Sequence, residues 1–91
     1  MEHVEGTVDP GEVVLFALST CVWCKKTRAL LEELGVTYDY EYVDLASPAR
    51  QQEIEAEISA RVERPAYPTL CTAEGCVVGY RPDAIKDLLK L

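Results

Sequence analysis

Two cysteines, Cys21 and Cys24, stand where a strand should pass into a helix, and this pair constrains the chain more than any other feature. An apolar run of strand length, residues 13–18, precedes the pair, and residues 25–34 follow it with the spacing of a helix. A strand that passes into a helix here places Cys21 at the helix N-terminus, where unpaired backbone N–H groups and the helix dipole favour an anion. Cysteines in this setting form the nucleophilic thiolate more readily. We therefore expect Cys21 to attack disulfides.

Cys24 lies three residues after Cys21, so the two sulfurs share one face of the expected helix and can close a small ring. This spacing is typical of a reversible dithiol. Such a pair also occurs in zinc sites and structural disulfides, but zinc sites need a second pair and usually carry the first on a tight turn. The order of strand, pair and helix favours redox chemistry. Lys25 follows the pair, and its charge either stabilises the thiolate or serves only solubility.

The composition limits the classes of partner. The 91 residues suit one domain, and no apolar stretch reaches the roughly 18 residues needed to span a membrane. The net charge of −7 argues against nucleic acid and membrane surfaces, because both are bound through clustered Lys and Arg. The first residues are acidic where a signal peptide would be basic and then apolar, so we expect a cytoplasmic protein. Cysteines in that compartment are more often catalytic or metal-binding than joined in structural disulfides.

The order of apolar and turn segments predicts an α/β domain with the pattern βαβαββα. Gly35 ends the first helix, Ser47-Pro48 supplies the N-cap and first residue of the second, and Pro82 begins the third. The expected strands are residues 12–18, 36–43, 69–72 and 76–79. Because a crossover between strands is right-handed, the first two strands are expected to be parallel neighbours. Residues 1–11 are expected to form a flexible tail, and residues 12–91 the folded domain.

The second expected strand alternates tyrosine with other residues. Tyr38, Tyr40 and Tyr42 therefore share one face of it. An aromatic platform for a ligand is one interpretation, but a half-exposed strand at the sheet edge explains the pattern more simply. We assign these tyrosines no chemistry.

A second pair of cysteines, Cys71 and Cys76, flanks the turn between the third and fourth strands. Their sulfurs could meet across the hairpin in a regulatory disulfide, but we interpret them as ordinary thiols. A function of another class would use Cys21, Cys24, Cys71 and Cys76 together. A zinc site would need the two pairs within about 4 Å of each other, because zinc–sulfur bonds are about 2.3 Å long. An iron–sulfur site is a further alternative.

With this element order and the Cys-x-x-Cys motif at the first strand-to-helix turn, the chain resembles the glutaredoxin branch of the thioredoxin superfamily over residues 12–91. The resemblance implies a four-stranded mixed sheet in the order 2-1-3-4 with three helices. It also implies that Pro68, which matches the family's cis-proline by position, packs against the dithiol. In the family this proline aims the preceding backbone, here Tyr67, at the incoming disulfide segment like a short added strand.

Two motifs resemble those of the NrdH-redoxins, glutaredoxin-shaped electron donors to ribonucleotide reductase. They are Cys21-Val22-Trp23-Cys24 and the more specific Gly79-Tyr80-Arg81-Pro82-Asp83. The chain departs from the usual glutaredoxin pattern at Leu18 in place of lysine, at Ala66-Tyr67 in place of Thr-Val, and at Tyr80 in place of the second glycine. Each departure removes part of a glutathione clamp. The resemblance therefore implies reduction by a thioredoxin reductase or another disulfide reductase.

The resemblance further implies a dithiol mechanism that needs neither a metal nor a cofactor beyond the redox-active disulfide. Cys21 attacks one sulfur of a substrate disulfide, and Cys24 then attacks Cys21 and releases the reduced substrate. The residues expected to contact the substrate are Thr20, Val22, Trp23, Tyr67, Pro68, Gly79 and Tyr80. The expected substrate is a protein disulfide, and the protein is expected to act as a monomer. A glutaredoxin that depends on glutathione or another small thiol is the alternative.

Overall fold

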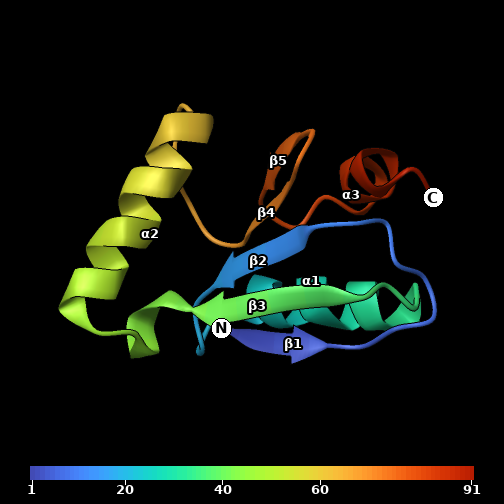
Figure 1. Ribbon diagram of the computed structural model, residues 1–91, viewed down its shortest axis with the longest axis horizontal. Helices are drawn as coiled ribbons and strands as arrows, with labels where there is room; N and C mark the ends of the chain where they lie inside the picture. The colour runs from blue at the N-terminus through green and yellow to red at the C-terminus, as the bar shows by residue number, and fades with distance from the viewer.

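The computed structural model describes residues 1–91 as one sheet with helices on both faces (Figure 1). The elements are, in order, β1 (Glu2–Val4), β2 (Val13–Ala17), α1 (Val22–Glu33), β3 (Tyr38–Tyr42), the 3-10 helix η1 (Val43–Leu45), α2 (Pro48–Arg61), β4 (Thr69–Thr72), β5 (Gly75–Val78) and α3 (Pro82–Leu89). From β2 onward the strands and α-helices have the predicted order, βαβαββα. None of the helices combines the length and the apolar character needed to cross a membrane.

The sheet contains five strands in the order β1-β3-β2-β4-β5. β2 is parallel to β3 and antiparallel to β4, and β4 and β5 form an antiparallel hairpin. The four predicted strands therefore have the expected order, 2-1-3-4, in a mixed sheet. The predicted number of strands was wrong by one, because β1 pairs antiparallel with β3 at the outer edge (Figure 1).

β1 is short and polar, and no sequence pattern marks it as a strand. Glu2 and His3 are exposed, and Val4 is half-buried. The segment is a strand because it pairs with β3, where His3 lies opposite Asp39. The Nδ1 atom of His3 is 2.6 Å from the Oδ1 atom of Asp39. β3 is therefore an interior strand, and the interpretation of it as an edge strand is corrected.

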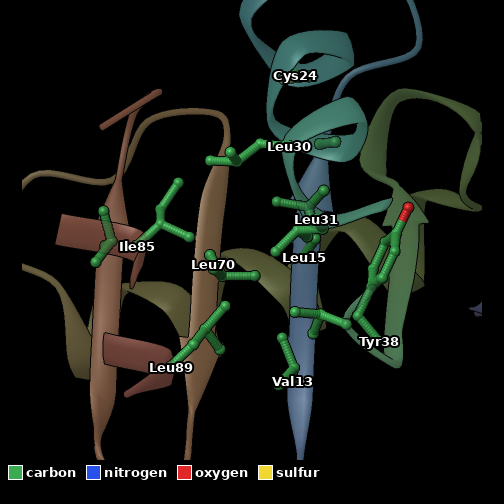
Figure 2. Close-up of a cluster of buried hydrophobic side chains, with 12 residues drawn as sticks. Val13, Leu15, Cys24, Leu30, Leu31, Tyr38, Leu70, Ile85 and Leu89 are labelled. Carbon is green, nitrogen blue, oxygen red and sulfur yellow. The ribbon is translucent and has the colours of Figure 1, made fainter. Parts of the chain in front are cut away.

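The helices cover the two faces of the sheet unequally. α1 and α3 pack on one face, where their buried side chains meet those of the strands in the larger cluster, and Figure 2 shows these side chains directed toward one another. α2 covers the other face, where Ile54 and Ile58 pack with Phe16 and Val43. β2 lies between the two clusters and is apolar on both sides, as expected of a central strand. Cys24 belongs to the larger cluster, so the cysteine pair is anchored in the core.

The predicted helix ends are confirmed. The Ser47 hydroxyl accepts a hydrogen bond from the Arg50 backbone N–H at 3.2 Å, and Pro48 is the first residue of α2. Gly35 follows α1 with a φ of +70°, a backbone conformation that other residues rarely adopt. Pro82 is the first residue of α3.

Candidate active site

The cysteine pair occupies the start of α1. Cys21 is the N-cap residue, and its sulfur accepts a hydrogen bond from the Cys24 backbone N–H at 3.2 Å. The side chain of Cys21 thus caps the helix as serine or aspartate commonly does, except that the hydrogen-bond acceptor is a sulfur atom. The helix begins at Val22, so both sulfurs lie within its first turn. The Cys21 sulfur therefore lies at the positive end of the helix dipole, beside the unpaired N–H groups of the first turn.

The two cysteines differ in their access to solvent. Cys21 is half-buried, whereas Cys24 is only 1% exposed and is packed in the core. Burial, followed by a hydrogen bond with Cys21, raises the pKa of the Cys24 thiol to about 12, although the Leu18 backbone N–H donates to its sulfur at 3.4 Å and opposes the increase. Cys24 is therefore a protonated thiol at neutral pH. The pair consists of one reachable sulfur and one shielded sulfur.

A cleft of about 250 Å³ is formed by five of the residues predicted to contact the substrate, namely Trp23, Tyr67, Pro68, Gly79 and Tyr80. Trp23 comes from the first turn of α1, and its ring stacks with that of Tyr80 at 5.8 Å between centroids. The Tyr67–Pro68 peptide bond is cis, as the resemblance implied. The Gly79 backbone N–H donates to the Pro68 carbonyl at 2.7 Å, which joins the two chain segments that line the cleft.

The other two predicted contact residues lie outside this cleft. Thr20 is exposed in the turn before Cys21, and Val22 is 62% exposed on the first turn of α1. Neither lines the cleft.

The three basic residues after the pair lie in different surroundings. Lys25 is exposed, and its ammonium makes no hydrogen bond or ion pair in the structure. The Lys26 ammonium lies over the Trp23 ring, 4.8 Å from the centroid. Arg28 turns to the tyrosines of β3: it donates to the hydroxyls of Tyr38 and Tyr42 at 3.1 and 2.9 Å. These two hydrogen bonds connect α1 to β3 of the sheet.

Asp44, in η1, is a neighbour of the site that sequence reasoning missed. Its carboxylate accepts hydrogen bonds from the Ser19 hydroxyl and from the Ser19 backbone N–H, the latter at 2.8 Å. These bonds hold the pKa of the Asp44 carboxyl below its usual range. They fix the turn that leads from β2 to Cys21. No local pattern could have revealed the contact, since 25 residues separate the partners.

Cys71 and Cys76 are joined in a disulfide, so the interpretation of them as ordinary thiols was wrong. They are directly opposite each other in the β4–β5 ladder, and their Cα atoms are 4.1 Å apart. Cys21 and Cys24 are free. The four cysteines thus form two separate pairs, and no group of three or more Cys, His, Asp or Glu side chains is gathered as a metal site would require.

Comparison with known proteins finds a matching family model and several solved structures of the same fold. The family model described as Glutaredoxin matches residues 13–77. The crystal structure of the glutaredoxin from Methanosarcina mazei Go1 is 40% identical, covers 99% of this chain and 87% of its own, and superimposes with a TM-score of 0.93. Methanoredoxin from Methanosarcina acetivorans is 36% identical over 100% of this chain and 96% of its own, with a TM-score of 0.91. The NrdH-redoxin from Escherichia coli, at 24% identity over 86% of this chain and 95% of its own, has a TM-score of 0.69 and shares the fold.

Proposed function

The chain belongs to the glutaredoxin family, and from this premise we propose that it is a thiol-disulfide oxidoreductase that reduces protein disulfides through a reversible Cys21/Cys24 dithiol. The observation that carries the proposal is the asymmetry of the pair. Cys21 caps α1 and is reachable, while Cys24 is buried as a thiol directly behind it. One sulfur is thus suited to attack the substrate and the other to resolve the product.

In the first step, the Cys21 thiolate attacks one sulfur of the substrate disulfide. The substrate S–S bond breaks, a Cys21–substrate disulfide forms, and the second substrate sulfur leaves as a thiolate that takes up a proton. The cleft supports this step, because an extended substrate segment is able to lie along the Tyr67 backbone, against the stacked rings of Trp23 and Tyr80.

In the second step, Cys24 loses its proton and attacks the Cys21 sulfur. The Cys21–Cys24 disulfide forms, and the first substrate sulfur is released as a thiolate, so that the substrate has gained two electrons. Hydrogen bonding with Cys21 is one of the causes that raise the Cys24 pKa. Once Cys21 carries the substrate, its sulfur is part of a disulfide and accepts hydrogen bonds more weakly, so this cause is weakened when Cys24 must ionise. The reaction needs no cofactor other than the dithiol.

The proposed electron source is a thioredoxin reductase or another disulfide reductase, with an NrdH-like role as donor to an enzyme such as ribonucleotide reductase. The residues that support it are Leu18, Tyr67 and Tyr80, which replace parts of the usual glutathione clamp. The second candidate is a glutaredoxin that depends on a small thiol. The 40% identity to the glutaredoxin from Methanosarcina mazei supports this candidate.

The oxidised protein is offered two reducing systems separately: NADPH with a thioredoxin reductase, and glutathione or another small thiol. The readout is the number of Cys21 and Cys24 thiols that become available to an alkylating reagent. Rapid reduction by the enzyme system and slow reduction by the small thiols would support the NrdH-like role. The reverse result would contradict that role and support the second candidate. Failure of the reduced protein to reduce any protein disulfide would contradict both.

A further inference from the structure

The Cys71–Cys76 disulfide is a second sulfur centre, separate from the proposed dithiol. Cys71 lies opposite Val14 in the ladder between β4 and β2, and Val14 packs against the Phe16 cluster under α2. Cys24 belongs to the cluster on the opposite face of the sheet. The two pairs therefore lie on different faces, and neither pair needs the other for its local geometry.

Stabilisation of the fold is a weak explanation for this disulfide. The two cysteines are only five positions apart, and the hairpin that joins them is already closed by the pairing of Leu70 with Val77 and of Thr72 with Gly75. A disulfide restricts the unfolded chain least when the loop it closes is short. A cross-link at this position is therefore better explained by its chemistry than by chain entropy.

The two sulfurs differ in how easily a thiol can reach them. Cys76 is half-buried, whereas Cys71 is only 4% exposed. Thiol–disulfide exchange begins at a sulfur that the attacking thiolate can approach, and the other sulfur leaves. Attack is thus expected at Cys76, with Cys71 as the leaving group. Cys71 and Arg61 both line a cavity of about 290 Å³. The Arg61 guanidinium donates a hydrogen bond to the carbonyl of Thr72, the residue that follows Cys71.

The hairpin that carries this disulfide also supplies one side of the substrate cleft. β4 begins immediately after Pro68, and β5 ends immediately before Gly79 and Tyr80. The last pair of the ladder, Thr69 with Val78, lies two residues from the disulfide. Beyond it the Gly79 N–H donates to the Pro68 carbonyl. The cross-link therefore holds together the two strands whose ends line the cleft.

We propose that Cys71 and Cys76 form a second, reversible redox site that thiols open at Cys76, and that the closed disulfide keeps the hairpin in the conformation that binds disulfide substrates. One thiol attacks Cys76 and forms a mixed disulfide, while Cys71 leaves and takes up a proton. A second thiol attacks the mixed disulfide, so that Cys76 becomes a thiol and the two reductant molecules are joined as their disulfide. Two electrons and two protons pass to the site. The effect on the cleft rests on the function proposed above, whereas the redox site itself does not.

The redox site is tested with the double variant C21S/C24S, in which only Cys71 and Cys76 can react. The folded protein is equilibrated with mixtures of reduced and oxidised glutathione, quenched in acid and alkylated, and its intact mass is measured. We expect a reversible transition between no alkylated cysteines and two, and a single glutathione adduct that peptide mapping places on Cys76. The matched variant C71S/C76S should show no transition beyond that of Cys21 and Cys24. A disulfide that opens only after denaturation, or an adduct on Cys71, would overturn the proposal.

The link to the cleft is tested with Cys21 and Cys24 intact. Reduction of a protein disulfide is measured for the wild type with its hairpin disulfide closed and for the variants C71S/C76S and C71A/C76A. Two variants are used so that the test still holds if one of them misfolds. We expect KM to rise about fivefold, at the low end of coupling between sites, with kcat unchanged. An equal KM in all three proteins would overturn the link. Absence of activity in the wild type would instead contradict the proposed function, and the glutathione titration would still decide the redox site.

Discussion

Trp23 and Tyr80 stack with their ring centroids 5.8 Å apart, although they come from the first turn of α1 and from the loop after β5. Trp23 is 55% exposed, which is a large apolar surface to leave in water, and it lies two residues after the half-buried Cys21. The pair gives the cleft an aromatic side. Aromatic rings at such positions commonly dominate the binding energy of a partner chain.

Replacement of Trp23 by alanine is expected to lower kcat/KM for a protein disulfide about tenfold, because the substrate loses an aromatic contact worth roughly 1–2 kcal/mol. The loss should appear in KM, and reduction of a small disulfide that does not reach the ring should change little. The control is Leu45→Ala, which removes a 71% exposed apolar side chain of η1. Equal losses with the protein and small substrates would show that Trp23 acts on the sulfur chemistry instead of docking.

Arg28 is expected to be a structural residue. Its guanidinium binds the hydroxyls of Tyr38 and Tyr42 and lies 3.8 Å from the centroid of the Tyr40 ring. Arg28→Ala should lower the free energy of unfolding by about 2 kcal/mol, since two hydrogen bonds and a cation–π contact are lost. Urea denaturation measures this value. Arg64→Ala, at an exposed arginine without such contacts, is the control. A stable Arg28→Ala protein with altered thiol reactivity would assign Arg28 to the active site instead.

The stability of the reduced protein is expected to fall in alkaline solution because of Cys24. In the unfolded chain its thiol ionises near its ordinary pKa of about 9, whereas in the folded protein its pKa is raised to about 12. Between these values the folded state holds more protons than the unfolded state, so the free energy of unfolding decreases as pH rises. Denaturation curves at pH 8 to 11 should show a smaller decrease for Cys24→Ala than for the wild type. Parallel pH profiles would mean that the folded protein does not shield this thiol.

Much of the fold and of the cleft was predictable from sequence. The cysteine pair between an apolar strand and a helix and the capping by Ser47 depend on local patterns that a short window contains, whereas the place of Pro68 followed from the family resemblance. Five of the predicted contact residues meet in one cleft because the family motifs that carry them fix their places in the fold.

Other features were beyond sequence reasoning because they depend on contacts between distant segments. β1 consists of three residues without strand character, and only its pairing with β3 makes it a strand. The Ser19–Asp44 contact likewise joins segments with no shared pattern. The expectation of free thiols at Cys71 and Cys76 rests on the usual state of cysteines in the cytoplasm. The register of the hairpin, which places them opposite each other, decides their pairing instead.

The roles of Cys21 and Cys24 are tested most directly by trapping the mixed disulfide. Cys24→Ser and Cys21→Ser variants are each mixed with a disulfide-bonded protein substrate, quenched in acid, and mapped by mass spectrometry. The dithiol mechanism predicts that Cys24→Ser accumulates substrate joined to Cys21, because no resolving thiol remains, and that Cys21→Ser neither forms the adduct nor turns over. Full turnover by Cys21→Ser, or substrate joined to Cys24, would contradict the mechanism.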